Sequence, residues 1–157
     1  MRDSNPQIRL FDDPRAIDAA AWDALVEADP DANPFLRHAF LAALQASGAA
    51  DAASGWAARF LTVWRGPRLV AAVPLYAKGH SYGEYVFDWA WAEAQHRAGA
   101  EYYPKWLVAV PFTPVTGTRL LAVDAAARAG ALEALLELVR STTLSSLHVL
   151  FAPPCCR

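Results

Sequence analysis

The apolar positions of the 157-residue chain recur with two different periods, which predicts an alternation of strands and helices. Residues 7–11 alternate polar and apolar side chains and predict a short first strand. Asp18 is a helix-start signal, and Trp22, Leu25 and Val26 follow at the spacing that places three side chains on one helical face. The N-terminal part is therefore predicted to be a strand followed by an amphipathic helix.

The next segment changes from a helical to a β period. Asn33 with Pro34 opens a second helix, in which four apolar positions recur at three and four residues: Leu36, Phe40, Leu41 and Leu44. Residues 56–64 and 69–76 are β-rich and flank a turn at residues 65–68, which predicts a hairpin. Pro74 lies in the second arm and predicts an edge or a bulge there.

The C-terminal half continues the alternation. Residues 84–98 have helical composition, residues 106–110 and 119–123 predict short strands, and Asp124 caps a further helix. That helix carries an apolar stripe of Leu132, Leu135, Leu136 and Val139. Residues 146–151 predict a final strand. The order β, α, α, β, β, α, β, β, α, β is typical of one mixed α/β sheet flanked by helices.

Composition and charge exclude several classes of function. A net charge of −2 and an isoelectric point near 6.0 give no electrostatic basis for binding DNA or an anionic membrane. The N-terminus lacks a secretory pattern, and the apolar stretch 106–115 contains two prolines and is too short to span a bilayer. Cys155 and Cys156 are adjacent, which suits neither a disulfide nor a metal site. We expect a cytoplasmic protein without a metal ion.

Residues 78–118 form the most distinctive segment, which is aromatic and rich in turns. Residues 78–89 follow a strand and lead into a predicted helix, a place where α/β folds bind ligands. Two glycines and the start of the helix could receive an anion, although the spacing matches no phosphate-binding fingerprint. Both lysines of the chain, Lys78 and Lys105, fall in this segment, an observation that chance also explains.

The same segment supplies the acid–base candidates. Glu84 and Asp88 are four residues apart, which places them on one face of the predicted helix, with His80 just before it. An amine that attacks an acyl carbonyl needs a proton acceptor, so these three residues are the candidate catalytic groups. Alternatively, the two carboxylates only favour the positive end of the helix dipole.

The aromatic residues of the segment allow two interpretations, a ligand groove or a core. We expect Trp91 and Trp106 in the core and the tyrosines nearer the surface. The proline-rich loop 110–117 either presents hydroxyl groups to a substrate or only turns the chain. The candidate substrate-binding residues are Lys78, Ser81, Tyr82, Tyr85, Trp89, Tyr102, Tyr103, Lys105, Thr113 and Thr116.

Three strings carry a resemblance to a known family: NPFLRHAFLAAL at residues 33–44, AAVPLYAKGHSYGEYVFDWAWAEA at residues 71–94, and YYPKWLVAVPFTPVTGTRLL at residues 102–121. They closely resemble the bacterial FemAB-like proteins, which belong to the GNAT-type acyl-CoA N-acyltransferase superfamily. The resemblance implies a GNAT-like fold and transfer of an acyl or aminoacyl group to an amine, with a peptidoglycan precursor as acceptor. It also implies acetyl-CoA or another acyl donor for the full-length relatives.

The chain departs from that family in two ways. Members contain two GNAT-like halves, so residues 1–151 are predicted to be the N-terminal half of an incomplete two-half protein, a fragment with an atypical tail at residues 152–157. The GNAT pyrophosphate loop, Gln/Arg-x-x-Gly-x-Gly/Ala, is absent from the sequence, so we expect no coenzyme A site in this chain alone. Two hypotheses follow: an N-acyltransferase completed by a second half, or a non-catalytic substrate-binding or structural half-domain that associates with that half or with itself.

Overall fold

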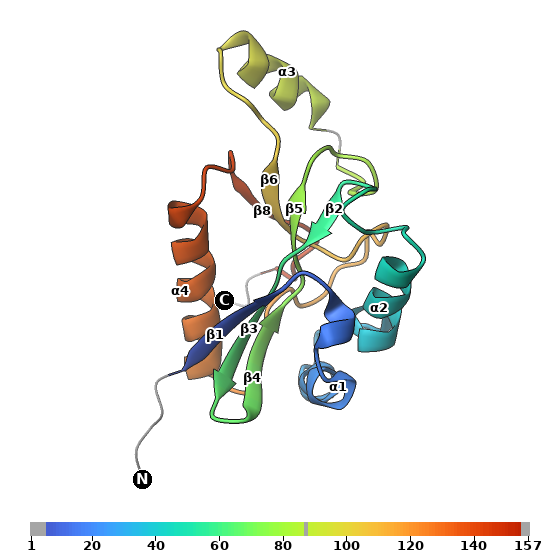
Figure 1. Cartoon of the computed structure of the whole chain (residues 1–157), viewed down its shortest axis with the longest axis vertical. Coiled ribbons are helices and arrows are strands. Elements are labelled where there is room, and N and C mark those ends of the chain that lie inside the picture. The colour runs from blue at the N-terminus through green and yellow to red at the C-terminus, as the bar shows by residue number, and fades with distance from the viewer. Residues whose placement is uncertain (1–5, 87, 155–157) are drawn as a thin grey trace.

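The computed structural model describes residues 6–86 and 88–154, which form a mixed α/β structure with two sheets (Figure 1). In chain order the elements of this part are β1 (Gln7–Phe11), η1 (Pro14–Ala16), α1 (Ala19–Ala28), η2 (Pro34–Leu36), α2 (His38–Ala46), β2 (Trp56–Ala58), β3 (Phe60–Arg65), β4 (Arg68–Val73), β5 (Leu75–Lys78), α3 (Trp89–Arg97), β6 (Lys105–Val108), β7 (Leu121–Ala122), α4 (Ala125–Ser141) and β8 (Leu147–Val149). The predicted alternation of strands and helices is confirmed, but each arm of the predicted hairpin is divided into two strands, and the strands form two sheets rather than the single sheet expected.

The chain passes directly from one sheet to the other at two points. One sheet has the order β1-β3-β4-β7 and the other β2-β5-β6-β8, with β6 and β8 parallel and the other pairs antiparallel. Only Arg59 separates β2 from β3, and only Pro74 separates β4 from β5. The Arg59 amide donates to the Leu75 carbonyl at 2.8 Å across this junction. The hairpin therefore runs through both sheets.

Pro74 marks the crossing between sheets. A proline cannot donate a ladder hydrogen bond, so the irregularity that it predicts is present. Of the two predicted alternatives, the edge position does not occur, because β4 lies between β3 and β7, and β5 lies between β2 and β6. The missing amide is accommodated where the chain leaves one sheet and enters the next.

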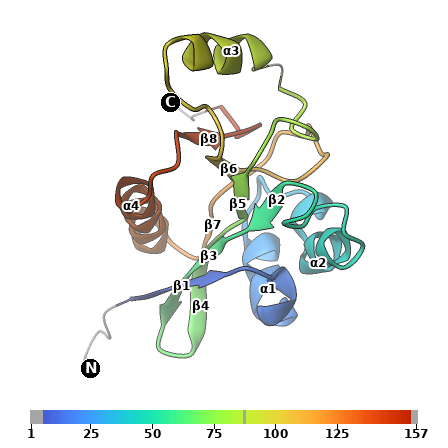
Figure 2. The ribbon, with the colours of Figure 1, turned by 45° about the horizontal axis from the view of Figure 1, so that its top comes forward.

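Helices cover both faces of the sheets. Figures 1 and 2 show α1 and α2 on one side and α4 on the other. Trp22, Leu25 and Leu36 pack in the core of the first side, and the Trp22 indole donates to the Leu36 carbonyl at 2.8 Å. Asp18 caps α1 through the amide of Ala21, as its sequence position predicts. The predicted apolar face of α1 is thus buried.

The stripe predicted for α4 is only partly correct. Leu135 is buried and Val139 is half-buried, whereas Leu132 and Leu136 are 48% and 38% exposed. The buried face of this helix consists of Ala127, Ala131 and Leu135. Small alanine side chains let the helix approach β3 and β4 closely. The spacing of the leucines alone did not indicate that alanines form much of the buried face.

The third helix differs most from its prediction. It begins at Trp89 rather than at Glu84, and none of its described residues is buried. Trp91, expected in the core, is 73% exposed, whereas Trp106 is buried as predicted. Phe87, which the predicted helix included, lies outside the described residues. In Figures 1 and 2, α3 projects beyond the ends of β5 and β6.

The proposed division at residue 151 stays a prediction. Cys155 and Cys156 of the predicted tail lie outside the described residues. Within residues 6–86 and 88–154, no helix is both long and apolar enough to cross a membrane.

Close contacts fix residues 79–86 of the loop of residues 79–88, which joins β5 to α3. The Phe112 amide donates to the Gly83 carbonyl at 3.0 Å. A Cβ atom at Gly83 would lie 2.5 Å from the Phe112 ring, and one at Gly55 would lie 2.3 Å from His80 Nε2. The loop is therefore held between the Phe112 ring and the turn at Gly55.

Replacing Gly83 with alanine tests this contact. Gly83 has φ +81° and Gly99 has φ +80°, but nothing lies within 4 Å of a Cβ at Gly99. Gly99→Ala should lower the free energy of unfolding by about 1 kcal/mol, the cost of a left-handed alanine. Gly83→Ala should cost about 1–3 kcal/mol more because of the clash. Equal losses of stability in urea unfolding would contradict the account.

Candidate functional site

The two lysines of the chain lie opposite each other on neighbouring strands. Lys78 on β5 pairs with Lys105 on β6, and Trp56 on β2 pairs with Lys78 on its other side. Directly opposite residues on antiparallel strands have neighbouring side chains, and like charges there repel each other. Both lysines are fully buried. Such an arrangement requires compensating negative charge.

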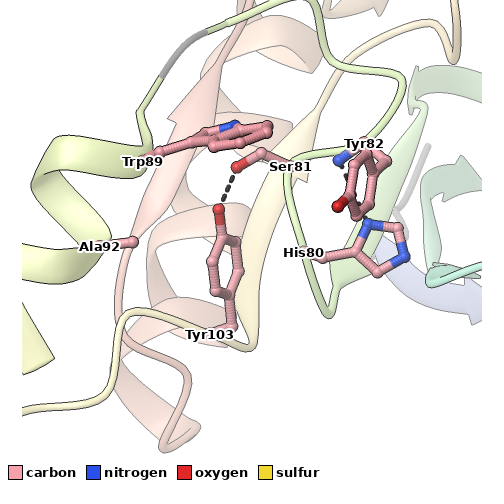
Figure 3. A pocket seen from close by; sticks show the side chains of 6 residues that line it. All are labelled: His80, Ser81, Tyr82, Trp89, Ala92 and Tyr103. Atoms are coloured by element: carbon pink, nitrogen blue, oxygen red, sulfur yellow. Dashed lines mark hydrogen bonds between the residues drawn. The ribbon is translucent and has the colours of Figure 1, made fainter.

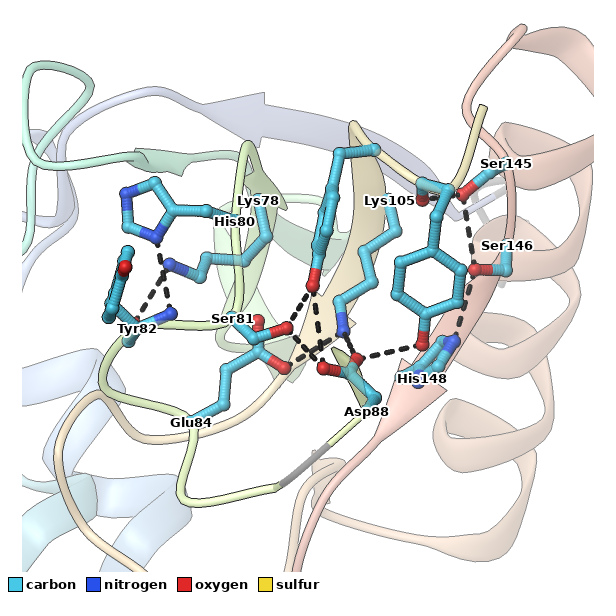
Figure 4. A network of polar contacts seen from close by, with 12 residues as sticks. Lys78, His80, Ser81, Tyr82, Glu84, Asp88, Lys105, Ser145, Ser146 and His148 are labelled. Carbon is cyan, nitrogen blue, oxygen red and sulfur yellow. Dashed lines mark hydrogen bonds and ion pairs between the residues drawn. The ribbon is translucent and has the colours of Figure 1, made fainter. Parts of the chain in front are cut away.

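Lys105 receives that compensation from the loop of residues 79–88. Its ammonium group lies 2.9 Å from Glu84 Oε2 and 2.6 Å from Asp88 Oδ2 (Figure 4). Burial lowers the pKa of Lys105, but hydrogen bonds to Asp88 and Glu84 outweigh this and raise it above its usual value. One buried ammonium group therefore joins two carboxylates to the sheet.

Asp88 is the most heavily hydrogen-bonded group of the site. Its Oδ2 atom also accepts from the Tyr102 hydroxyl at 2.7 Å, and its Oδ1 atom accepts from Ser81 and, at 3.4 Å, from Tyr103. Burial raises its pKa, but the bonds from Lys105, Ser81 and Tyr102 prevail and lower it to about 2. The carboxylate is thus ionised at neutral pH.

Glu84 differs from Asp88 in its second oxygen. Oε2 binds Lys105, whereas Oε1 is buried without a hydrogen-bond partner among the described residues. Burial raises the pKa of Glu84 above its usual value, despite the opposing effect of Lys105. Within the site, Glu84 is therefore the carboxyl with the greater tendency to take up a proton.

Lys78 lies in a more apolar environment. Its ammonium group stands 4.1 Å from the centre of the Trp56 ring and donates to the Tyr82 carbonyl at 3.1 Å. Burial lowers its pKa to about 8, with repulsion from Lys105 in the same direction and attraction to Glu84 opposing it. A cation over an indole face is stabilised by the ring quadrupole.

A cleft of about 200 Å³ opens beside this network and is lined by His80, Ser81, Tyr82, Trp89, Ala92 and Tyr103. Figure 3 shows the Ser81 and Tyr103 hydroxyl groups joined to each other, with Trp89 above them. Tyr82 and Trp89 are 68% and 62% exposed. Aromatic walls with a few polar groups are typical of small-molecule sites.

A second cavity of about 440 Å³ lies on the other side of Asp88 and is lined by Val86, Asp88, Trp91, Gln95, Tyr102, Ser146 and His148. His148 contacts the Ser146 hydroxyl at 3.1 Å, and its pKa is lowered by burial. The Asp88 carboxylate and its two tyrosine partners thus separate two openings.

The three candidate catalytic residues occupy two places. Glu84 and Asp88 meet at Lys105, but they do not share a helix face, because α3 starts only after both of them. Both carboxylates pair with Lys105 on β6, and residues 84 and 88 do not form the helical turn that was expected. His80 lies apart, with Nδ1 accepting from the Tyr82 amide at 3.2 Å. Burial lowers the pKa of His80.

The candidate substrate-binding residues are also only partly brought together. Ser81, Tyr82, Trp89 and Tyr103 line the cleft, while Tyr102 is buried, contrary to the expected surface position. Three others lie elsewhere: Tyr85 is exposed outside both cavities, Thr113 donates to the Pro111 carbonyl, and Thr116 is exposed in the loop beside Asn33.

Two amides of the segment predicted to receive an anion already have internal partners. The Tyr82 amide binds His80, and the Glu84 amide donates to the Ser81 carbonyl at 3.3 Å. In residues 6–86 and 88–154, no three His, Cys, Asp or Glu side chains are grouped to hold a metal ion.

Sequence reasoning missed Trp56 and Phe112. Trp56 contacts Lys78, and Phe112 holds the loop at Gly83. The presence of only two lysines, each in an apolar strand segment, was the available signal for the lysine pair. Nothing in the local sequence indicates the contact of Phe112.

The low pKa of Asp88 predicts a specific loss of stability in acid. Because the pKa falls from 3.8 to about 2 on folding, the ionised form stabilises the fold by roughly 2 kcal/mol. This contribution is complete above the unfolded value and is lost as the pH falls through the folded value. Urea unfolding at a series of pH values should show that the free energy of unfolding falls less steeply between pH 3.8 and about 2 in Asp88→Asn. Wild type and the exposed control Asp12→Asn should show the full fall. A decline as steep as in wild type would refute the assignment.

Comparison with known protein families identifies the family of this chain. Residues 13–155 match the FemAB-like family, which is described as peptidoglycan biosynthesis/recognition. No curated protein and no solved structure matches the chain. The family match spans nearly the whole chain, so it confirms the resemblance carried by the three sequence strings. The chain belongs to the FemAB-like family.

Proposed function

We propose that this chain is an N-acyltransferase domain of GNAT-like fold, which binds an amine-bearing peptidoglycan precursor in the cleft beside Ser81 and Tyr103. The family description supports the substrate class. The mixed α/β architecture with helices on both faces is compatible with the fold.

The observation that carries the proposal is the pair of hydroxyl groups bound to an ionised carboxylate at the wall of the cleft. Ser81 donates to Asp88 and therefore accepts from Tyr103, which leaves one lone pair on the Ser81 oxygen and the lone pairs of the Tyr103 oxygen as acceptors for the cleft. An ammonium group has three N–H donors and needs such acceptors. The faces of exposed Tyr82 and Trp89 add cation–π attraction.

In the reaction, the amine nitrogen attacks the acyl carbonyl carbon of an ester or thioester. The bound ammonium group first loses one proton to Glu84, so that its nitrogen has a lone pair for the attack. A carbon–nitrogen bond then forms, the bond to the alcohol or thiol breaks, and the second proton lost by nitrogen passes to the leaving group, while Glu84 releases the first proton to water. Asp88 is a weak base at its pKa of about 2, so it positions the hydroxyl groups. Glu84, with a raised pKa, is the proposed proton acceptor.

Glu84 is connected to the cleft by hydrogen bonds. Ser81 binds Asp88, and both carboxylates bind Lys105, so the chain of contacts runs from the cleft wall to Glu84. His80, the third candidate base, lines the cleft, but its Nδ1 atom accepts from the Tyr82 amide. It is therefore proposed as a wall residue.

The acceptor site is tested with a soluble peptidoglycan precursor that has a free side-chain amine. Calorimetry should detect binding of this precursor and at least tenfold weaker binding after its amine is acetylated, because acetylation removes the charge. Tyr103→Phe removes one acceptor oxygen and should weaken binding of the free amine severalfold, whereas exposed Tyr85→Phe outside the cleft should not. Equal binding of the two precursors would refute an amine site.

A second candidate function is recognition of the precursor without transfer. The hydrogen bonds that surround Asp88 favour it, because a carboxylate with donors on both oxygens anchors a loop better than it accepts a proton. Mass spectrometry of the precursor after incubation with acetyl-CoA distinguishes the two candidates. An acetylated product supports transfer with this donor, whereas binding with no modification favours recognition or a different donor.

A further inference from the structure

A cavity on another part of the molecule is not used by the proposed reaction. It measures about 250 Å³ and lies between α4, β8 and the ends of β4 and β6. Val73, Val108, Leu132, Leu135 and Val149 form much of its wall. Leu132 and Val149 are 48% and 47% exposed, so apolar surface extends to the rim. The volume is slightly below the roughly 300–1,000 Å³ of sites for drug-sized ligands, which suits a small apolar molecule.

The wall of this cavity contains a buried guanidinium group. Arg119 is only 4% exposed. It donates to four backbone carbonyls: those of Leu150, Gly117, Thr118 and Val115. A guanidinium group has five N–H donors, so among the described residues one donor on Nη2 has no partner. Among the described residues no carboxylate forms an ion pair with Arg119.

An uncompensated buried charge is costly, and burial lowers the pKa of Arg119. Carbonyl dipoles satisfy hydrogen bonds but leave the net positive charge in place. An anion in the cavity would therefore be attracted to this group more strongly than to an exposed arginine.

A second guanidinium group lines the same cavity. Arg128 on α4 forms an ion pair with Asp29 Oδ2 at 3.6 Å, too long for a hydrogen bond, and its side chain is 54% exposed. Asp29 does not itself line the cavity, so the exposed part of the Arg128 side chain can contact a ligand there. The lining contains the hydroxyl of Thr118 and two guanidinium groups but no acidic side chain.

We propose that this cavity binds a small aliphatic carboxylate, with its chain against the leucine and valine wall and its carboxylate at Arg119 and Arg128. Guanidinium groups bind carboxylates through charge-assisted hydrogen bonds, and the apolar wall gains from each methylene group removed from water. None of the residues of this site belongs to the cleft at Ser81, so the two proposals stand or fall separately.

The test uses octanoate with hexanoate and octanol as matched probes. Calorimetry below the micelle concentration should give saturable binding of octanoate, about tenfold tighter than hexanoate because two methylene groups are added. Octanol has the same chain length without the charge and should bind at least tenfold more weakly than octanoate. Equal binding of octanol and octanoate, or no binding of octanoate, would overturn the proposal.

Three variants locate the site. Arg128→Gln should weaken octanoate at least fivefold and leave octanol unchanged. Leu132→Trp fills the cavity from an exposed helix position and should abolish octanoate binding. Leu136→Trp, one turn further along α4 and outside this cavity, is the control and should bind octanoate like wild type. Thermal unfolding verifies that each variant is folded. Octanoate binding that survives both Arg128→Gln and Leu132→Trp would place the ligand elsewhere and contradict the proposal.

Discussion

The contact of Lys105 with Glu84 and Asp88 is the constraint on which the rest of the site depends. Two lysines stand side by side on a buried part of the β5–β6 pair, and without negative partners this arrangement would be strongly unfavourable. The loop of residues 79–88 brings both carboxylates to Lys105. As a consequence the loop is drawn onto the sheet, α3 starts only at Trp89, and the Ser81 and Tyr103 hydroxyl groups face an open cleft.

This arrangement also separates the roles of two otherwise similar carboxyl groups. Asp88 accepts from three hydroxyl groups and an ammonium group and stays ionised, whereas Glu84 keeps an unpaired oxygen and a raised pKa. Environments that shift the pKa values of neighbouring carboxyls in opposite directions are typical of functional sites, although structural networks produce them too. Membership in a family described as peptidoglycan biosynthesis/recognition is consistent with a functional role and with a structural role of these two carboxyl groups.

Much of the fold could be predicted from local sequence signals. Asp18 and Asp124 each cap a helix as expected, and the turn at Gly66 joins β3 to β4. Asn33 caps only the short turn η2, and the helix predicted to open there begins at His38. These features are local because a cap or a turn needs only the neighbouring residues. The start of α3 was wrong because ion pairs with a strand seventeen or more residues away override the helical preference of residues 84–88.

The site was predictable in its location but not in its geometry. Residues 78–103 contain all six residues of the cleft, as their aromatic and polar composition suggested. The pairing of Lys78 with Lys105 depends on the register of β5 and β6, which periodicity does not determine. Thr113 and Thr116 lie away from the cleft: the Thr113 hydroxyl donates to Pro111 within its own loop, and the Thr116 carbonyl accepts from the distant Asn33, a contact that local sequence does not indicate.

A double-mutant cycle between Lys105 and Asp88 tests the central claim most directly. The free energies of unfolding of Lys105→Met, Asp88→Asn and the double variant would be compared with wild type in urea. If the buried ion pair anchors the loop, the double variant will be more stable than the sum of the single losses predicts, by about 1–3 kcal/mol. Losses that add to within about 0.5 kcal/mol would show that the two residues act independently and would contradict the account.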